Sequence, residues 1–576
     1  MKWSGRFEGY GLHMLRRDLV SGLIVGIVAI PLAMSFAIAS GVKPQFGIYT
    51  TIIAGFLISL LGGSRFQIGG PTGAFIPVLL GIVLQFGYGD LLIAGMLAGV
   101  LLILMGVFRL GALIQFIPRP VTVGFTSGIA VIIFSGQIAN FLGLRDIKRH
   151  DDFLSSMKEI GLHISTVNPY SITTAAVCLA VIVLMPRLLP RIPASLIGLV
   201  ASALVASVFF HGKLATIGSA YGVIPSTLPT LVIPHLTFDK IIQLLQPAFV
   251  IAMLGGIESL LSAVVADGMS GSRHNSNREL IGQGIANLAA PLFGGIPATG
   301  AIARTATNIK SGAASPVSGM VHSIAVLIIL MAFAPLASAI PLAGMAPILM
   351  VVAWNMSERK EFVHMLKMKS GDSLVMLLTF LLTVLTTLTT AVEIGLVMAV
   401  LMFVIRMRDS LIVSKVLPDP SSQSGKVRPS AVHDRRDCPQ ISIYSIEGPL
   451  FFGAANQFER SMADTLRLRP KVLLLRMAKV PFIDATGEAH LASVVGRFRR
   501  SGGTVLVSGI RPQPKAYLHK TGLAEQIGED RFYEHTGEAI GEALGRLELH
   551  QCAGCKHNAF RECAALSCAA AQTGAK

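Results

Sequence analysis

Long apolar runs separated by short polar loops fill the first two thirds of the chain. Roughly twenty apolar residues are enough to cross a bilayer as a helix. The pattern predicts about fourteen crossing segments, several of them short, at 19–39, 46–61, 71–86, 90–108, 120–141, 171–189, 193–210, 245–266, 279–293, 299–312, 316–339, 343–356, 373–389 and 391–408. We therefore expect a polytopic α-helical membrane protein whose apolar surface faces the lipid bilayer.

The pattern changes after Arg408. Residues 410–438 are polar and contain Pro418, Pro420 and Gly425, which is typical of a linker. Strands that alternate with helices then predict a small α/β domain. The expected strands are 441–446, 471–475 and 504–508, and the expected helices lie near 454–467, 486–501, 512–521 and 537–547. The expected divisions are an N-terminus at 1–18, a membrane domain at 19–409, a linker at 410–438, an α/β domain at 439–548 and a cysteine-rich tail at 549–576.

Composition supports a membrane protein. Of the 576 residues, 52% are hydrophobic and 14% are charged, whereas a soluble domain has about 25% charged residues. The formal net charge of +16 does not indicate a nucleic-acid partner, because the basic residues lie between apolar runs and in the last third of the chain rather than on one compact basic domain.

Basic residues in the loops predict the orientation. Those on the same side as the N-terminus are Arg109, Arg119, Arg187, Arg191, Arg273, Arg278, Arg359, Lys360, Lys367 and Lys369. Since basic loops stay on the cytoplasmic side, we expect both termini in the cytoplasm and the protein in a bacterial inner membrane. Arg145, Lys148 and Arg149 are exceptions, in a longer loop where the rule is weak. A cleaved signal peptide at 19–39 is disfavoured because the run is too long and another follows at once.

Two short runs share a pattern that is interrupted by glycine and proline. The segments beginning Gly69-Gly-Pro-Thr-Gly-Ala and Gly294-Gly-Ile-Pro-Ala-Thr-Gly-Ala lie about half a membrane domain apart. Paired, interrupted segments of this kind point to the midplane site of a transporter. A helix that begins inside the membrane presents free N–H groups and a partial positive charge, so two facing helix starts would form an anion site. The competing interpretation is a pair of ordinary helix kinks.

A carboxylate interrupts the apolar run at 248–266. Glu258 and Ser262 are four residues apart and therefore lie on one face of a helix. A carboxylate inside the bilayer is expensive, so we expect Glu258 to face a partner or a water-filled cavity. Together with the interrupted segment at 294–308, it is interpreted as one wall of an anion-transport site.

Several longer motifs resemble one known family. Ile27-Val-Ala-Ile-Pro31, Gly62-Gly-Ser-Arg-Phe-Gln-Ile-Gly-Gly-Pro-Thr-Gly-Ala74 and Glu279-Leu-Ile-Gly-Gln-Gly-Ile-Ala-Asn287 resemble signatures of the sulfate permease family, which are secondary anion transporters with a C-terminal STAS domain. The resemblance covers about residues 15–545. It implies two inverted repeats of about seven segments, a core and a gate domain, an anion site between the third and tenth segments, and a homodimer. The stretches 255–261 and 349–358 are most similar to the bacterial C4-dicarboxylate transporters of that family.

The resemblance also implies roles for individual residues. The expected substrate-binding residues are Gly73, Ala74, Thr299, Gly300, Ala301 and Arg304. Arg304 falls where animal relatives keep an arginine beside the anion. Sodium-coupled bicarbonate relatives carry an acidic residue and two threonines where this chain has Glu258, Ser262 and Ile302. The missing hydroxyl at Ile302 disfavours sodium, because a hard cation needs oxygen ligands.

Glu258 and Ser262 are accordingly the expected coupling residues of an anion–proton symporter. Burial favours the protonated form of a carboxylate, so Glu258 is expected to be neutral when loaded and ionised after release. Three alternatives remain open: a permanent ion pair between Glu258 and Arg304, a snorkelling Arg304 near a segment end, and hydroxyls at Ser262, Thr299 and Thr305 that bond only their own backbone.

The α/β region resembles the STAS fold that is shared with anti-sigma-factor antagonists, through the segments 448–453 and 482–487. In those antagonists a phosphorylated serine follows the aspartate, whereas Ala485 follows Asp484 here. Asp484 and Thr486 are the regulatory candidates, and we expect Thr486 to cap the next helix rather than to be phosphorylated. The domain is expected to bind a cytoplasmic protein or to serve in assembly.

The tail has a metal-like cysteine spacing. Cys552, Cys555, Cys563 and Cys568 would suit zinc or an iron–sulfur cluster. The alternative is a disordered tail with incidental cysteines, and no cofactor is required for transport.

The expected function is secondary active transport of sulfate, a C4-dicarboxylate or bicarbonate, coupled to protons. The alternative is an uncoupled or sodium-coupled transporter or channel of the same fold. An enzyme is not expected, because no cluster of catalytic residues occurs in the membrane segments.

Overall fold

The computed structural model describes residues 10–114, 118–150, 152–188, 193–386, 388–418, 427–428, 432, 436–454, 457–462, 470–552, 555, 557, 559–563 and 565. The chain divides into two compact units, Met1–Ala399 and Val400–Lys576. Each unit is described by itself.

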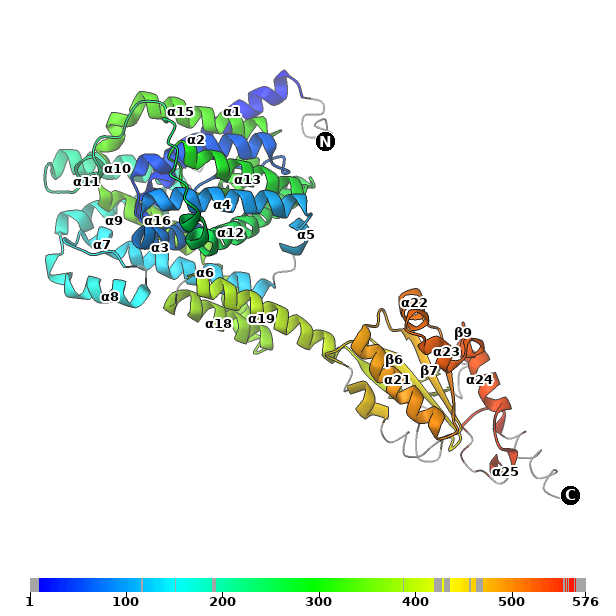
Figure 1. The fold of residues 1–576 in the computed structure, drawn as a ribbon. Coiled ribbons are helices and arrows are strands. Elements are labelled where there is room, and N and C mark those ends of the chain that lie inside the picture. The colour runs from blue at the N-terminus through cyan, green and yellow to red at the C-terminus, as the bar shows by residue number, and fades with distance from the viewer. Residues whose placement is uncertain are drawn as a thin grey trace. The chain divides into compact units, whose positions relative to one another are not determined.

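Unit 1 is built from helices (Figure 1). They are α1 (Leu12–Ala39), α2 (Pro44–Leu61), α3 (Ile76–Phe86), α4 (Tyr88–Val107), α5 (Gly111–Ile114), α6 (Arg119–Gly136), α7 (Ile138–Leu142), α8 (Phe153–Leu162), α9 (Pro169–Leu188), α10 (Ala194–Phe209), α11 (Ile217–Tyr221), α12 (Phe238–Ser270), α13 (Ser276–Leu292), α14 (Ile302–Lys310), α15 (Val317–Ser338), α16 (Leu342–Met356), α17 (Arg359–Lys367), α18 (Gly371–Leu385) and the first part of α19 (Leu388–Asp409), whose last ten residues belong to unit 2. Each predicted apolar run falls on one of these helices or on a consecutive pair. Among the described residues, 7 helices are long and apolar enough to cross a membrane.

Large apolar side chains cover the outside of unit 1. Leu104 on α4, Leu204 on α10 and Phe333 on α15 are among many that are exposed. A soluble protein rarely exposes apolar surface on this scale, and lipid tails are the surroundings that suit it. The helix pattern and the exposed surface therefore agree with the predicted membrane domain.

The helices of unit 1 form two bundles. In the first, which we call the core bundle, α13 packs on α4 and α2, α15 on α1 and α2, and α12 on α4 and α14; α1, α2, α4, α13 and α15 run side by side in Figure 1. In the second, the gate bundle, α18 packs on α6, α9 on α10, and α16 on α9 and α6. The division matches the core and gate that the family resemblance implies.

Two very short strands join the halves of the core bundle. β1 (Gly69–Gly70) pairs antiparallel with β2 (Thr299–Gly300), with Gly69 opposite Gly300 and Gly70 opposite Thr299. The amide of Ala301 extends the pairing by donating to the carbonyl oxygen of Ile68. Gly70 has a φ of +148°, and a side chain there would lie 2.7 Å from Nη1 of Arg304. Only glycine fits this crossing.

Buried side chains fix the segments that lead into the two strands. Glu279 accepts hydrogen bonds from the amides of Gly63 (2.7 Å) and Ser64 (2.9 Å) and from Nε2 of Gln283 (2.9 Å). On the second half, Asn287 bonds both the amide and the carbonyl of Ala298, at 2.8 and 2.9 Å. These bonds satisfy backbone groups that helix packing leaves without partners.

A five-stranded sheet forms the centre of unit 2. The strands are β3 (Ile412–Lys415), β6 (Ile441–Glu447), β7 (Val472–Lys479), β8 (Thr504–Ser508) and β9 (Phe532–Tyr533), in the order β3-β6-β7-β8-β9. β3 is antiparallel to β6 and the other neighbours are parallel. The helices of this unit are α21 (Ala485–Arg500), α22 (Pro512–Lys520), α23 (Leu523–Ile527), α24 (Thr536–Gly545) and α25 (Leu549–Cys552). A separate pair joins β4 (Leu417–Pro418) to β5 (Val427–Arg428).

The predicted linker at 410–438 differs from the structure, because its start is part of the α/β fold. Leu411 and Leu417 are buried on either side of β3, the edge strand of the sheet. A four-residue strand among prolines and charges gives too short an alternating pattern to be recognised. The sequence pattern also did not predict β9, which has 2 residues, or α23, which has 5 residues. Of the expected helix near 454–467, residues 457–462 are helical as predicted, and 455–456 and 463–467 lie outside the described residues.

Candidate functional site

The two interrupted helices each begin shortly after one of the two paired strands. A turn at Gly73–Phe75 leads into α3, and α14 starts at Ile302, directly after the paired strands. The first amides of a helix have no acceptor within it and carry a partial positive charge. The amides of Gly73 and Ala74 at one start, and of Ile302 and Ala303 at the other, are therefore two electropositive helix ends that follow the paired strands. This arrangement suits a small anion.

The region lies where the core bundle meets the gate bundle. An added Cβ on Gly73 would lie 3.5 Å from Ile133, 3.6 Å from Phe36 and 3.7 Å from Met356. Ile133 and Met356 belong to α6 and α16 of the gate bundle. Ile302, at the start of α14, is 36% exposed. A ligand at these helix starts would therefore be held between the two bundles.

The other expected substrate ligands are engaged within the protein. The amide of Gly300 donates to Oγ of Ser259 at 3.1 Å, and that of Ala301 donates to Ile68. The Thr299 hydroxyl lies 2.7 Å from Oγ of Ser259 and donates to the carbonyl of Gly255 at 3.1 Å. The amides of Gly300 and Ala301 are therefore used within the protein, whereas the amides of Ile302 and Ala303 have no acceptor within α14.

Arg304 holds the two interrupted segments together. Its Nη2 donates to the carbonyl of Pro71, and its Nη1 is buried with no partner among the described residues. Arg304 is 3% exposed, so it does not snorkel to the membrane surface. No ion pair joins it to Glu258. The structure therefore contradicts two of the open alternatives, the snorkelling arginine and the permanent ion pair.

Other buried polar groups gather around the same crossing. A side chain on Gly55 would meet the carbonyl of Gly69 and the ring of His322, and one on Gly300 would meet the amide of Gln67. The ring nitrogens of His322 and the amide of Gln67 have no partners among the described residues. Sequence reasoning missed His322, since a single histidine in an apolar helix carries no pattern.

Glu258 faces a small cavity between the two bundles. The cavity has a volume of about 50 Å³ and is lined by Glu258 and Leu261 of α12, by Phe125 and Thr126 of α6, and by Thr379 of α18. Glu258 is 9% exposed. Within the described part of the chain, no hydrogen bond or ion pair holds its carboxylate; the hydroxyls of Thr126 and Thr379 donate to carbonyls of their own helices. Glu258 is therefore a buried carboxylate beside a cavity with room for water and without a fixed partner among the described residues.

Ser262 lies on the same face of α12 but has a different environment. Its hydroxyl donates to Oγ1 of Thr305 at 3.2 Å, and that oxygen in turn accepts from the amide of Ile68. Ser262 is fully buried. Its hydroxyl therefore ties α12 to the interrupted segments instead of opening toward the cavity of Glu258.

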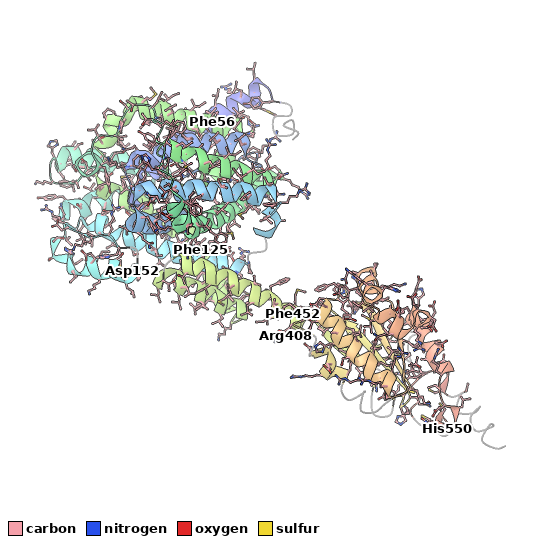
Figure 2. The ribbon with its side chains drawn as sticks, viewed as in Figure 1. Phe56, Phe125, Asp152, Arg408, Phe452 and His550 are labelled. Carbon is pink, nitrogen blue, oxygen red and sulfur yellow. The ribbon has the colours of Figure 1, made fainter. Side chains whose placement is uncertain are left out.

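The structure corrects the expected helix cap in unit 2. Asp484, not Thr486, is the N-cap of α21, because its Oδ1 accepts from the amide of Gly487 at 2.8 Å. Its other oxygen accepts from the amide of Phe452, a residue labelled in Figure 2, at 3.1 Å. Thr486 is exposed in the first turn of α21. The sequence did not identify Asp484 as the cap, because it lies in a segment that resembles a phosphorylation motif.

The tail cysteines are only partly described. Sγ of Cys552 accepts from Nε2 of Gln440 at 3.6 Å, and Sγ of Cys563 accepts from the amide of Phe560 at 3.3 Å. Burial raises the pKa of the Cys552 thiol. In the described part of the chain, no three His, Cys, Asp or Glu side chains are grouped as metal ligands, and Cys568 lies outside it.

Comparisons with known proteins match both units. The profile of the sulfate permease family matches residues 15–379, and that of the STAS domain matches residues 434–539. The chain is 52% identical over 541 residues to "Putative sulfate transporter YvdB" of Bacillus subtilis, covering 94% of this chain and 100% of that protein. It is 30% identical over 553 residues to bicarbonate transporter BicA of Synechocystis, covering 93% and 96%.

Solved structures show the same fold. The structure titled "The overall structure of SLC26A9" matches with a TM-score of 0.83 at 19% identity, covering 93% of this chain and 91% of that one. The transmembrane domain of a cyanobacterial BicA matches with a TM-score of 0.60 at 30% identity, covering 68% and 98%. With both profiles, the apolar helices and the C-terminal sheet in agreement, the chain belongs to the sulfate permease family and ends in a STAS domain.

Proposed function

We propose that this protein is a secondary active transporter that carries a small anion, coupled to protons through Glu258. The observation that carries the proposal is the pairing of β1 with β2, which brings the starts of α3 and α14 together where the two bundles meet. Backbone amides at two helix starts attract an anion without a fixed cationic ligand. An anion held this way can be released, as a transport cycle requires.

The candidate substrates are sulfate, a C4-dicarboxylate and bicarbonate. Relatives of this chain are named for sulfate and for bicarbonate, and the motifs at 255–261 and 349–358 resemble dicarboxylate transporters. Backbone amides recognise negative charge rather than one chemical group. Uptake assays are therefore needed to distinguish the three anions.

Proton coupling follows from the surroundings of Glu258. An ionised carboxylate in a cavity of about 50 Å³ without a cationic partner is strongly disfavoured, whereas the protonated form is tolerated. Sodium is disfavoured because the hydroxyls of Ser262 and Thr299 are bonded within the core bundle and residue 302 is an isoleucine. A hard cation at Glu258 would lack the several oxygen ligands it prefers.

Uptake into proteoliposomes tests the proposal. Radiolabelled sulfate, succinate and bicarbonate are supplied at an external pH of about 6 or about 8, on either side of neutrality. Each measurement is made with and without sodium. We expect saturable uptake of at least one anion that is faster at the acidic external pH and indifferent to sodium. Glu258→Gln should abolish the pH dependence, whereas the matched surface variant Glu361→Gln, paired with Arg119 in the structure, should keep it. Uptake of every anion by an unsaturable, pH-independent route would favour the alternative, an uncoupled channel.

Three further roles belong to the proposal. Both termini face the cytoplasm of a bacterial cell, as the basic residues in the loops on that side support.

The transporter is a homodimer whose STAS domain binds a cytoplasmic protein, and the exposed Thr486 beside Asp484 is the regulatory position. Cys552, Cys555, Cys563 and Cys568 hold zinc or an iron–sulfur cluster, which elemental analysis of the purified protein tests; a metal content near zero would exclude it.

A further inference from the structure

A polar hollow opens on the face of unit 1 where α7 ends and α9 begins. It consists of two adjoining cavities of about 690 and 350 Å³. Both are lined by Arg145, Asn168, Gly212 and Lys213, which come from the loop after α7, the segment before α9 and the turn after α10. The hollow is therefore built from elements of the gate bundle and from the loops at its end.

The lining carries positive charge and neutral polar groups. No acidic side chain is among the described residues that line either cavity. The neutral groups are already committed: Asn168 bonds the carbonyl of Lys213 and the amide of Tyr170, and Thr166 accepts from the amide of Arg145. These bonds fix the walls of the hollow.

Arg145 and Lys213 differ from Arg149, a basic residue in the same loop as Arg145. Arg149 is bound, since it donates to the carbonyl of Ile38 and to the hydroxyl of Tyr221, each at 2.9 Å. The side chain of Arg145 is exposed and has no hydrogen bond or ion pair with any described residue. Lys213 lies above the ring of Tyr170, 4.4 Å from its centroid, and its exposed ammonium donates one hydrogen bond to the Tyr170 hydroxyl at 3.2 Å, which leaves its other N–H groups for a ligand.

The nearby carboxylates are occupied elsewhere. Asp152, labelled in Figure 2, caps α8 by accepting from the amide of Ser155. Glu159 accepts from the amide of Lys148 and lies within 3.7 Å of a ring nitrogen of His150. Asp146 follows Arg145 directly but forms no ion pair with it in the described structure. Arg145 and Lys213 are therefore the charged residues that line the hollow.

The hollow continues the helix run that borders the candidate site. Phe125 of α6 lines the cavity of Glu258, Ile133 lies beside Gly73, and Ala139 and Asn140 of α7 line the hollow. Asn140 follows Ile133 by seven positions in the chain, across the turn at Gln137 that separates α6 from α7. The hollow thus lies farther along the same stretch of the gate bundle that borders the helix starts.

We propose that the hollow is a capture site in which Arg145 and Lys213 attract the transported oxyanion before it reaches the helix starts. The inference rests on the proposed anion transport and adds two residues to its path. A concave surface lined by one sign of charge concentrates the opposite ion and raises its association rate, most strongly for a divalent anion. Exposed charges act through solvent, so added salt screens the effect.

Uptake kinetics test the capture site. For the double variant Arg145→Gln, Lys213→Gln we expect a Vmax/KM for sulfate that falls about tenfold at low ionic strength and approaches the wild-type value in high salt, with Vmax unchanged. The fall should be smaller for bicarbonate, which carries less charge. Lys360→Gln, an exposed lysine on α17, is the matched control and should behave as wild type. An unchanged Vmax/KM at low salt, or a loss confined to Vmax, would overturn the inference.

A second measurement does not depend on transport. Ser165, which lines the larger cavity, is replaced by cysteine, and its modification rates by an anionic and a cationic methanethiosulfonate reagent are compared, with the parent protein as background. We expect the anionic reagent to be preferred, the preference to disappear in the double variant, and sulfate to slow the reaction. Equal rates for both reagents would refute capture even if transport is present. Leu214→Cys, in the second cavity, repeats the test if Ser165→Cys folds poorly. Failure of the proposed function would instead appear as a wild type without anion uptake.

Discussion

Glu279 offers a test of how the loop before β1 is held. Its carboxylate is fully buried and accepts from the amides of Gly63 and Ser64. Replacement by alanine leaves two buried N–H groups without an acceptor, at about 1–3 kcal/mol each. The expected destabilisation of Glu279→Ala is therefore about 2–6 kcal/mol.

Replacement by glutamine should be much milder. The new amide oxygen can accept from Gly63 and Ser64, while its NH₂ group faces Gln283. Since Oε1 of Gln283 has no partner among the described residues, that amide can turn over and accept. What is lost is the extra strength of a charge-assisted bond, about 1–2 kcal/mol.

Thermal unfolding of the purified protein in detergent measures the relative stability of wild type, Glu279→Gln and Glu279→Ala. We expect Glu279→Gln to unfold slightly below wild type and Glu279→Ala several degrees lower. Hydrogen exchange at Gly63 and Ser64 should accelerate only in the alanine variant. Glu361→Ala, which removes an exposed ion pair with Arg119, is the control and should change little. Equal losses for Gln and Ala would refute the reasoning, because charge rather than acceptor number would then hold the loop.

The remaining predictions concern three other positions. Gly70→Ala should abolish uptake and lower stability, because φ is +148° there and a side chain would collide with a buried guanidinium; normal uptake would contradict this. Asp484→Ala should destabilise α21 by about 1 kcal/mol and speed its hydrogen exchange, whereas Thr486→Ala should not; the reverse order would restore the threonine as the cap. The amide of Ser155 keeps the pKa of Asp152 in the folded protein below its usual value. The cap therefore stabilises α8 at a pH above the pKa that Asp152 has in the unfolded chain. This stabilisation is lost as the pH falls through the lower pKa that Asp152 has in the folded protein. Exchange in α8 should rise below about pH 4 in wild type, and a similar rise in Asp152→Ala would disprove the assignment.

The helices of unit 1 could be predicted because lipid imposes a simple rule. Each crossing segment must be apolar over most of its length, so the runs at 19–39 or 171–189 in the sequence coincide with α1 and α9. The interrupted segments were also visible, since glycine and proline stand out in an apolar run. Their strand pairing was not, because a two-residue strand has no period to detect.

The details of the site depended on contacts between distant segments. Glu258 was found from sequence because a carboxylate in an apolar helix is costly wherever it points. The bonds of Thr299 to Ser259, of Arg304 to Pro71 and of Asp484 to Gly487 could not be found this way. Each is decided by which backbone group comes within reach after folding, and residue type alone does not specify it.

The bracing of the two interrupted segments has a consequence for selectivity. Asn287, Ser259 and Glu279 all belong to the core bundle and hold β1, β2 and their loops from within it. A recognition surface fastened in this manner keeps its shape whichever compartment it is open to. The helix starts should therefore bind competing anions in the same order from both faces of the membrane, and any difference between the two faces must arise outside the core bundle.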